Sequence, residues 1–509
     1  MHRAALLAFR SAACTVSLAV AALLSGCAAT LERVVDAQLG EYFETVASAP
    51  APLVHGLARL PFSEYWTGIV FNGEKVGFSH LEVARSAGMP GEWELRSEAA
   101  FALRLLGIEK KVTLKAQDVV GEDLTLRRFA YEYVLDGSEM RVTGRREGDA
   151  LLARVTAGGA TTEQRLALNG PLYPSSAILL YPVVHGLSPG REYSFRVYSG
   201  ELQAVREVSQ RVEALQRSRL FEGAAYKVET RMAGQRVLTW IDERGRPVFE
   251  LAMQGVMISA LEDEERARSY VALSALNKKE SLVEYSLVRP DRPVERPRAV
   301  AALRVALAGV ASAPPSDAWQ RCAPQGAEIV CEIAPSPAAA ATPVDPKYLD
   351  ASITVQSRDP EIRRLAAEIA GEVAAPVERI ARLVRWMEAN IEKAPLDVFS
   401  ARDVLERRRA ECQGHAWLFA ALARALGIPT RVVNGLAYSE QLGGFLYHTW
   451  NESLVDGDWR AVDPTFGQVR ADATHLKLFE GETLAELLPL LDFVGRLKIR
   501  VLGAEHAAP

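Results

Sequence analysis

One cysteine, Cys412, stands in a sequence context that suits a nucleophile. The apolar residues that follow it recur at helical spacing up to Leu426, and Gly427 and Pro429 end the pattern. Cys412 is therefore predicted to open a helix. The backbone N–H groups and the positive end of the helix dipole favour a thiolate there, and the same N–H groups could bind an oxyanion. A catalytic thiol also needs a histidine that exchanges its proton.

A histidine and a carboxylate of suitable chemistry follow on neighbouring strands. The residues from Gly444 to Pro464 read as a β-hairpin with its turn at Asp456-Gly457. His448 lies on the first strand and Asp463 on the second, so we expect the two side chains to meet. Asp463 would fix the tautomer of His448 and stabilise the imidazolium formed beside a thiolate. The sequence thus predicts a triad of Cys412, His448 and Asp463.

Each of these residues also has a structural interpretation. A single cysteine is commonly a small buried apolar residue, His448 could be a core histidine with its hydrogen bonds made, and Asp463 could be a turn residue before Pro464. His415 is a second candidate base, three positions after Cys412, but no carboxylate that would orient it is evident. We therefore expect a local hydrogen-bonding role for His415. The ordered set of cysteine, histidine and aspartate favours the catalytic interpretation of the other three.

The same region resembles the transglutaminase-like superfamily of papain-like folds. The family pattern is a cysteine that opens a helix, followed by "RALGIPTR", "HTW" and "W..VDPT", which are matched by Arg424–Arg431, His448–Trp450 and Trp459–Thr465. The resemblance covers roughly the last third of the chain. It implies that Cys412 is the nucleophile, that His448 is the base and acid, and that Asp463 orients the imidazole. Many members carry glycine two residues before the cysteine, where this chain has Ala410.

The start of the chain is typical of a secreted bacterial lipoprotein. An apolar run from Cys14 to Leu24 follows two arginines and is shorter than the roughly 20 residues that a membrane-spanning helix needs. The run ends in Leu24-Ser25-Gly26-Cys27, a lipobox pattern, so we expect a signal peptide at residues 1–26 and lipidation of Cys27. By resemblance to Gram-negative lipoproteins, Ala28 in place of aspartate implies the periplasmic face of the outer membrane. The acyl chains would attach the protein to the membrane.

The other cysteines agree with an oxidising compartment. Cys14 lies in the segment expected to be cleaved, and Cys27 is expected to be acylated. Cys322 and Cys331 flank a Pro-Gln-Gly turn and could form a disulfide across a hairpin. Cys412 is then the remaining thiol. A thiol kept in an oxidising compartment favours a use in catalysis.

Composition indicates a globular protein with several cores. The chain has 509 residues, 49% of them hydrophobic, and a net charge of −5 without a long basic run. Nucleic acid is therefore an unsuitable partner. No metal-ligand or phosphate-loop spacing stands out, so we expect neither a metal nor a cofactor.

We predict an α+β protein whose parts follow one another along the chain. An antiparallel β-rich domain should occupy residues 61–290, because hairpin patterns such as Tyr65–Phe78 recur there. Its pattern weakly resembles the curved sheets of periplasmic lipoprotein carriers, so a lipid or peptide groove is an alternative to a substrate-positioning role. The other predicted parts are a tether at 27–60, a small β module with linkers at 291–345, and a transglutaminase-like domain at 346–509.

Three helices should precede Cys412 in the last domain. Asp359-Pro360 has the pattern of an N-cap followed by proline, and a second helix should start at Pro376. Ser400-Ala401-Arg402-Asp403 is a capping-box pattern that opens a third, short helix.

We expect a lipid-anchored cysteine enzyme that acts on amide bonds of a protein or peptide. Thiolate attack would give a thioester acyl-enzyme. Water as acceptor makes a peptidase or amidase, and an amine makes an acyltransferase; hydrolysis is the simpler expectation because it needs no second binding site. The competing interpretation is a non-catalytic module that keeps the fold and binds a peptide or lipid. No oligomeric state is predicted.

Overall fold

The computed structural model describes most of the chain. The described residues are 42–46, 52–71, 74–105, 108–252, 257–269, 287–310, 313–334, 345–483, 486, 493 and 497–507. The predicted signal peptide and Cys27 lie outside them. The chain forms two compact units, one built largely from residues before Ser281 and the other from Leu282–Pro509.

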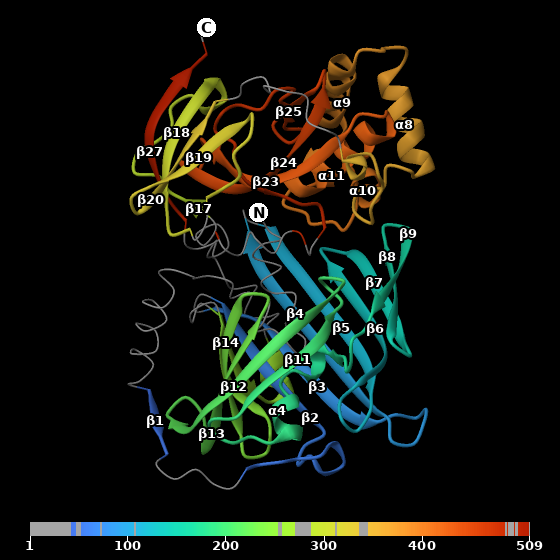
Figure 1. Cartoon of the computed structure of the whole chain (residues 1–509), viewed down its shortest axis with the longest axis vertical. Helices are drawn as coiled ribbons and strands as arrows, with labels where there is room; N and C mark the ends of the chain where they lie inside the picture. The colour runs from blue at the N-terminus through green and yellow to red at the C-terminus, as the bar shows by residue number, and fades with distance from the viewer. Residues whose placement is uncertain are drawn as a thin grey trace. The chain divides into compact units, whose positions relative to one another are not determined.

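The N-terminal unit is built on one large sheet (Figure 1). Among the described residues it has 16 strands in the order β10-β11-β12-β13-β14-β15-β16-β2-β3-β4-β5-β6-β7-β8-β9, with β1 paired to β12. Every pairing between neighbours that follow one another in the chain from β2 to β7 is antiparallel, whereas β10 and β11 are parallel. The strands are β1 (Phe43–Thr45), β2 (Glu64–Phe71), β3 (Glu74–Arg85), β4 (Trp93–Leu105), β5 (Ile108–Val120), β6 (Leu126–Leu135), β7 (Ser138–Glu147), β8 (Ala150–Ala157), β9 (Ala160–Ala167), β10 (Tyr173–Pro174), β11 (Glu192–Ser199), β12 (Ala204–Ser218), β13 (Ala224–Met232), β14 (Gln235–Asp242), β15 (Pro247–Ala252) and β16 (Met257–Glu262).

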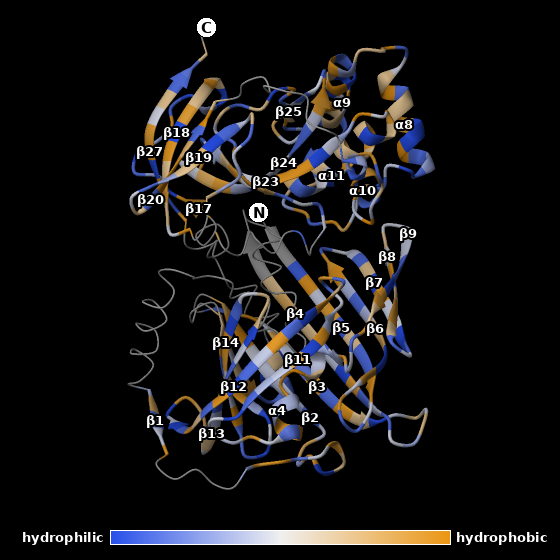
Figure 2. Ribbon diagram, viewed as in Figure 1, coloured by the Kyte–Doolittle hydropathy of each residue, from blue (hydrophilic) through white to orange (hydrophobic). Residues whose placement is uncertain are grey.

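Alternation along β6 gives this part of the sheet one buried face, whereas all six residues of β15 are buried. In β6 the side chains of Phe129, Tyr131 and Tyr133 are buried, while Arg128 and Ala130 between and before them are exposed. Figure 2 shows hydrophobic and hydrophilic residues alternating along the strands of this unit. A sheet that buries one face needs something to cover it. Two short helices supply part of that cover: α4 (Tyr181–His185) packs through Val183 in one apolar cluster, and α5 (Glu264–Arg268) packs through Ala267 in another.

Part of the segment expected to be a tether is held on this sheet. β1 pairs antiparallel with β12, and the Phe43 ring stacks on Trp240 with 4.3 Å between ring centroids. Leu53 forms an isolated β-bridge with Leu187. The described parts of the expected tether, residues 42–46 and 52–60, are therefore folded against the N-terminal unit, because their few apolar side chains find partners far along the chain.

In the described part of the C-terminal unit, four α-helices lie beside a five-stranded sheet (Figure 1). The sheet runs β17-β24-β23-β26, with β25 paired to β24. A parallel pair of two-residue strands, β21 and β22, flanks α10 in the sequence. The elements are α8 (Pro360–Ala370), α9 (Pro376–Asn390), α10 (Ala401–Arg407), α11 (Cys412–Ala425), β17 (Leu287–Val288), β21 (Glu392–Lys393), β22 (Arg409–Ala410), β23 (Thr430–Ser439), β24 (Gly444–Val455), β25 (Asp458–Val462) and β26 (Leu476–Glu480).

The predicted helix starts are confirmed. The Asp359 side chain accepts hydrogen bonds from the N–H groups of Glu361 and Ile362, and the Ser400 hydroxyl accepts one from Asp403. Such caps satisfy N–H groups that have no partner within the helix. α8 and α9 bury one face each, whereas α11 is buried from Gln413 to Arg424 and forms the centre of the helical core.

A four-stranded sheet in the same unit differs from the expected small module. Its order is β19-β20-β18-β27, from β18 (Val300–Ala308), β19 (Gln320–Gln325), β20 (Glu328–Ile333) and β27 (Lys498–His506). The sequence predicts β18 to β20 as a separate module, but β27 comes from the end of the chain. Its core residues, among them Val305, belong to one cluster with Trp450 of the larger sheet. The fold class is α+β, with a β-rich N-terminal unit.

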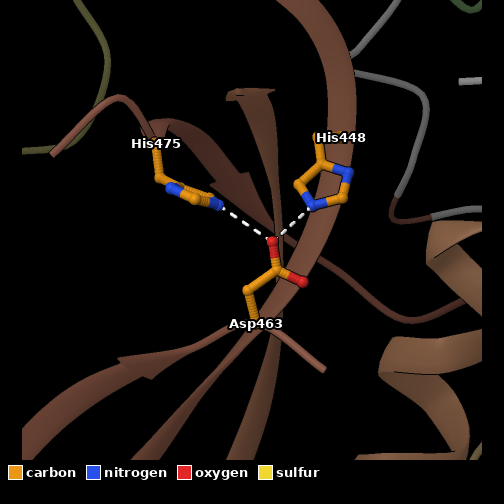
Figure 3. Close-up of side chains that lie close together, drawn as sticks. All are labelled: His448, Asp463 and His475. Atoms are coloured by element: carbon orange, nitrogen blue, oxygen red, sulfur yellow. Dashed lines mark hydrogen bonds and ion pairs between the residues drawn. The ribbon is translucent and has the colours of Figure 1, made fainter. Parts of the chain in front are cut away.

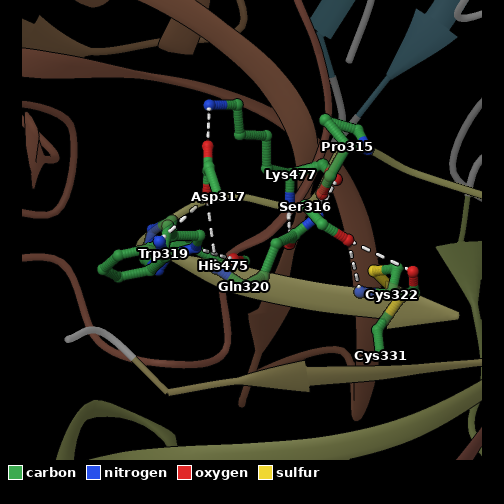
Figure 4. Close-up of a disulfide and its surroundings, with 9 residues drawn as sticks. All are labelled: Pro315, Ser316, Asp317, Trp319, Gln320, Cys322, Cys331, His475 and Lys477. Atoms are coloured by element: carbon green, nitrogen blue, oxygen red, sulfur yellow. Dashed lines mark hydrogen bonds and ion pairs between the residues drawn. A yellow bond between two sulfur atoms is a disulfide. The ribbon is translucent and has the colours of Figure 1, made fainter. Parts of the chain in front are cut away.

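A disulfide joins two strands of this small sheet. Cys322 on β19 and Cys331 on β20 are direct cross-strand partners, and their sulfur atoms are bonded at 2.02 Å (Figure 4). Cys331 is buried in the core cluster shared by the two sheets. The bond therefore fixes β19 onto the body of the C-terminal unit. Among the helices that the structure describes, none is both long enough and apolar enough to cross a membrane.

We predict that the double substitution Cys322→Ser and Cys331→Ser lowers the free energy of unfolding by about 2–3 kcal/mol, because the crosslink closes a short loop in the unfolded chain. Urea unfolding of the full chain measures this loss. Wild-type protein in excess reductant is the matched control and should unfold at the midpoint of the double variant. Equal midpoints for the oxidised wild type and the double variant would contradict the prediction.

Candidate active site

Cys412 is the first residue of α11, as its sequence context predicts. Its side chain is half-buried and remains a thiol. The helix starts where β22 ends, and Ala410 of β22 is buried against Gly414 of the first turn. A Cβ on Gly414 would lie 2.6 Å from the Ala410 methyl carbon, so residue 414 must be glycine for the turn and the helix to pack this closely. The chain has alanine at 410, where many family members have glycine, and the close packing at this point requires the glycine at 414.

The helix N-terminus is capped by a carboxylate, which changes the electrostatics expected from sequence. The Glu411 side chain accepts the N–H groups of Gln413 at 2.8 Å and Gly414 at 3.0 Å. The Cys412 thiol donates to the same carboxylate, with 3.3 Å between Sγ and Oε2. The two N–H groups are therefore engaged and do not provide the oxyanion site that the sequence predicts there. A carboxylate in contact also opposes a second negative charge on sulfur.

His448 is held near Cys412 by a link between its strand and α11. It lies in the middle of β24, opposite Gly435 of β23. Three residues further along β24, the Asn451 amide donates to the carbonyl oxygen of Ala416 at 3.0 Å. This buried hydrogen bond fixes the strand that carries the imidazole against the first turns of the helix that carries the thiol.

The imidazole of His448 connects the thiol to a buried carboxylate. Its Nε2 lies 2.8 Å from Oδ2 of Asp463 (Figure 3), and the ring also hydrogen-bonds the Cys412 side chain. Because Nε2 faces Asp463, Nδ1 is the nitrogen left for sulfur. Burial opposes protonation, but the charge of Asp463, its hydrogen bond and the contact with Cys412 raise the pKa of His448 to about 10. The Phe466 ring stacks on this imidazole with 4.7 Å between centroids.

Asp463 is buried and receives four hydrogen bonds. Its Oδ1 accepts the backbone N–H groups of Thr465 at 2.7 Å and Phe466 at 3.0 Å. Its Oδ2 accepts His448 and, at 3.0 Å, Nε2 of His475. Burial opposes the charge, but the two histidines hold the pKa of Asp463 well below its usual range. The carboxylate is thus ionised and fixed in position, one residue after the end of β25.

His475 is a residue of the site that the sequence does not reveal. It immediately precedes β26 and is fully buried, with its ring directed at Asp463 (Figure 3). Its Nδ1 lies 2.9 Å from the carbonyl oxygen of Asp472 and 3.4 Å from Oδ1 of that residue. No spacing relative to Cys412 marks this histidine in the sequence. It reaches Asp463 because β26 pairs with β23, which in turn pairs with β24.

The same three side chains have a spacing at which proteins can hold a metal ion. One atom each of His448, Asp463 and His475 lies within 4.8 Å of the others. Here both imidazoles approach the same carboxylate oxygen at hydrogen-bond distance. The observed geometry is therefore that of two donors on one acceptor.

The other predicted residues are not members of the triad. Nδ1 of His415 donates a local hydrogen bond to the carbonyl oxygen of Glu411 at 3.0 Å, and burial lowers the pKa of His415. This is the local role expected for it. Cys322 and Cys331 lie in their disulfide, and Cys27 lies outside the described residues.

A cavity of about 470 Å³ opens beside β25 in the C-terminal unit. Its lining combines apolar side chains such as Val377 and Trp459 with Arg460 and Arg470. None of its lining residues belongs to the triad, although Val462 directly precedes Asp463. The cavity therefore borders the strand that carries the carboxylate, not the sulfur.

Known proteins were compared with the chain. Residues 363–464 match the sequence family described as the transglutaminase-like superfamily. The kyphoscoliosis peptidase of Mus musculus is 28% identical over 144 residues, which is 25% of this chain and 22% of that protein. The human kyphoscoliosis peptidase is 27% identical over 128 residues, 22% of this chain and 19% of that protein. The chain thus spans about a fifth of the length of these curated relatives.

Two solved structures overlap parts of the chain. One is described as a candidate cysteine protease from Cytophaga hutchinsonii, with 17% identity and a TM-score of 0.27, covering 42% of this chain and 84% of its own. The other is a β-barrel-like protein from Brucella abortus, with 10% identity and a TM-score of 0.31, covering 39% of this chain and 95% of its own. Both TM-scores lie below those of structures that share an overall fold. On the family match, and with the motifs in place, the chain carries a domain of the transglutaminase-like superfamily at residues 363–464.

Proposed function

We propose that the protein is a cysteine enzyme that cleaves or transfers acyl groups at amide bonds of a protein or peptide substrate. The observation that carries this proposal is the connected set of Cys412, His448 and Asp463, with 2.8 Å between the imidazole and the carboxylate and a hydrogen bond between the imidazole and the thiol. A nucleophile, a proton-transfer group and an orienting carboxylate in contact are what thiol acyl chemistry requires. The family match supports the same reaction class.

The reaction would follow the roles that the geometry allows. The Cys412 thiolate attacks the substrate carbonyl, His448 gives its proton to the departing amine, and a thioester to sulfur remains. His448 then takes a proton from the acceptor, which attacks the thioester and releases Cys412. Asp463 keeps the imidazole oriented and balances its charge in both steps.

Hydrolysis is the version of this reaction that we favour. Water needs no second binding site, whereas an amine acceptor does. The name peptidase belongs to both curated relatives, which this chain matches over about a quarter of its own length. Peptide or amide hydrolysis is therefore the primary proposal, and acyl transfer to an amine is the alternative outcome of the tests below.

We further propose that the protein works in the bacterial cell envelope, anchored by lipid on Cys27 and facing the periplasm. The lipobox Leu24-Ser25-Gly26-Cys27 supports the anchor. The Cys322–Cys331 disulfide supports an oxidising compartment, since disulfides persist there and are rare in the cytosol.

The reactivity of Cys412 provides the first test of the triad. We predict rapid alkylation of Cys412 by iodoacetamide at pH about 6, slowed at least about tenfold in His448→Ala and less in Asp463→Asn, because the imidazolium stabilises the thiolate and the carboxylate supports the imidazolium. Since the pKa of His448 is raised to about 10, the ion pair should persist across neutral pH and be lost as pH rises through about 10. Mass spectrometry of the Cys412 peptide measures the rates.

His506→Gln is the control for this experiment, because its imidazole bonds the carbonyl oxygen of Glu295 at 2.8 Å and lies on β27, which carries no residue of the triad. It should alkylate like wild type. If wild-type Cys412 reacts as slowly as His448→Ala, the triad is not assembled, and a peptide-binding module without catalysis becomes the better account.

A covalent intermediate provides the second test. We predict that the full chain, incubated with peptides from a cell-envelope extract and quenched in acid, carries a hydroxylamine-sensitive acyl adduct on Cys412, and that Cys412→Ala loses the adduct and at least about a thousandfold of the turnover. Adding a fluorescent primary amine separates the two outcomes. Release of free carboxylate indicates hydrolysis, and labelled product indicates transfer. Neither an adduct nor any product would refute the proposed activity.

The anchor has its own test. We predict that Cys27→Ser abolishes incorporation of labelled palmitate and leaves an uncleaved precursor, because the thiol of Cys27 is the atom that carries the lipid. Cys14→Ser is the matched control: it also removes a cysteine from the leader and should keep the label. Label retained by Cys27→Ser would show that the attachment lies elsewhere.

A further inference from the structure

His475 stands between two acidic residues with an acceptor at each ring nitrogen. Nε2 faces Oδ2 of Asp463 at 3.0 Å, and Nδ1 faces the carbonyl oxygen of Asp472 at 2.9 Å. A carbonyl oxygen accepts hydrogen bonds and never donates them. Asp463 accepts two backbone N–H groups at Oδ1, and despite burial the charge of His448 holds the pKa of Asp463 well below its usual range, so Asp463 is ionised and it too can only accept. A nitrogen without a proton would place a lone pair against an oxygen on either side.

We infer that His475 is an imidazolium at neutral pH and acts as a positioning residue for the triad, holding Asp463 in place and drawing part of its negative charge away from His448. The inference rests on the proposed function of Cys412, His448 and Asp463. The pKa of His475 agrees with a charged imidazole: burial lowers this pKa, but the two carboxylates raise it above its ordinary value.

The charged groups around His475 alternate in sign. Beside Nδ1 of His475, the Asp472 carboxylate contacts the guanidinium of Arg298 at 2.6 Å. Arg298 belongs to the turn η4 (Pro297–Ala299). The desolvation of Asp472 is offset by His475 and Arg298, which hold the pKa of Asp472 well below its usual range. On the other side come Asp463, His448 and then Cys412.

Two further titratable groups beside this row of charged residues come from α11. They are Glu411, whose carboxylate contacts the thiol, and His415, which interacts electrostatically with Asp463 and whose pKa is lowered by burial. Charges of opposite sign therefore alternate in space, with the negative charge on sulfur present once the thiolate forms. The order of contacts is Arg298, Asp472, His475, Asp463, His448 and Cys412. His475 is thus one of two cations on the buried carboxylate of Asp463, and His448 is the other.

His475 is held in place by a different part of the unit. The Trp319 indole donates to the carbonyl oxygen of His475 at 2.8 Å (Figure 4). The Gln320 amide bonds both the N–H and the C=O of Lys477, at 2.9 and 2.7 Å, as a neighbouring strand would. These contacts from β19 and the residue before it fix the backbone that presents the imidazole.

The consequence for the reaction is an effect on both proton-transfer groups. A cation one carboxylate away makes His448 less basic and makes a negative charge on Cys412 easier to form. The His448 and His475 ring centroids are 5.7 Å apart, close enough for this influence to be felt in a buried site. Removing the charge of His475 should therefore move both limbs of the pH profile of Cys412 alkylation to higher pH.

Nuclear magnetic resonance tests the charge without relying on activity. The full chain labelled with 15N-histidine is recorded by long-range proton–nitrogen correlation, and His475→Gln identifies the signals of His475. We expect both ring nitrogens of His475 to carry protons from pH about 6 to about 8, the range in which an unperturbed imidazole loses one. One ring nitrogen without a proton at pH about 7 would overturn the inference.

A pH profile of Cys412 alkylation tests the effect on the triad. Glutamine at 475 keeps an N–H that can reach Asp463 but carries no charge, whereas His475→Leu removes both. We expect His475→Gln to fold and to shift the profile upward by about one pH unit, and His475→Leu to lose reactivity at least about tenfold. A purely structural hydrogen bond would give a His475→Gln profile superimposed on that of wild type, which would overturn the charge role.

The two readouts separate this inference from the proposed function. If wild-type Cys412 alkylates like an ordinary thiol while His475 carries two ring protons, the proposed enzyme fails and the charge of His475 stands. If Cys412 is reactive and His475 is neutral, the enzyme stands and the inference fails. Asp472→Asn provides an internal check, because removing the negative charge beside Nδ1 while keeping the carbonyl acceptor should let His475 lose its proton at a lower pH than in wild type.

Discussion

The buried carboxylate of Asp463 is the group on which the site depends. An ionised carboxylate out of contact with water is strongly unfavourable unless several donors and a cation compensate it. Here two backbone N–H groups fix one oxygen, and two imidazoles fix the other. The backbone donors come from the turn directly after β25, so the carboxylate is positioned by its own chain before any histidine is considered. This gives His448 an acceptor of fixed direction.

The rest of the C-terminal unit brings three separate segments to that carboxylate. β24 and β25 form the hairpin that sets His448 beside Asp463, and the Asn451 link to Ala416 holds α11 against the hairpin. The third segment, which carries His475, is set by β19. Because β19 is joined to β20 by the disulfide and shares a core with the larger sheet, the small sheet contributes directly to the geometry of the site. The side chains of Trp319 and Gln320 support the triad by holding the backbone of His475 and Lys477, and neither side chain belongs to the triad.

The parts of the site that depend on local sequence were predictable, and the parts that depend on long-range pairing were not. A helix opening at Cys412 and a hairpin through Asp456-Gly457 follow from periodicity and turn chemistry within about twenty residues, and both are confirmed. His475 follows an irregular loop, and its contact nearby in the sequence is with Asp472, so its approach to Asp463 depends on a sheet register that no local pattern encodes. The same holds for β27 and for β1, each of which pairs with a strand far away in the chain. The β-rich N-terminal unit was recognisable as a class, but the domain boundaries stay a prediction.

Glu411 shows where the sequence argument about the thiol was incomplete. A helix N-terminus stabilises a nearby anion by roughly 0.3–2 kcal/mol. A carboxylate about 4 Å away opposes it by on the order of 4 kcal/mol at an effective dielectric constant of 20. With Glu411 at 3.3 Å from sulfur, the dipole cannot be what stabilises a thiolate here. The interaction large enough to offset the repulsion from Glu411 is the contact of the thiolate with a protonated His448, whose charge is maintained by Asp463. Glu411 has a structural use that explains its presence, because it caps the helix that carries the nucleophile. The thiolate therefore depends on the imidazolium more strongly than in a site whose helix end is open, and so on the carboxylate behind it.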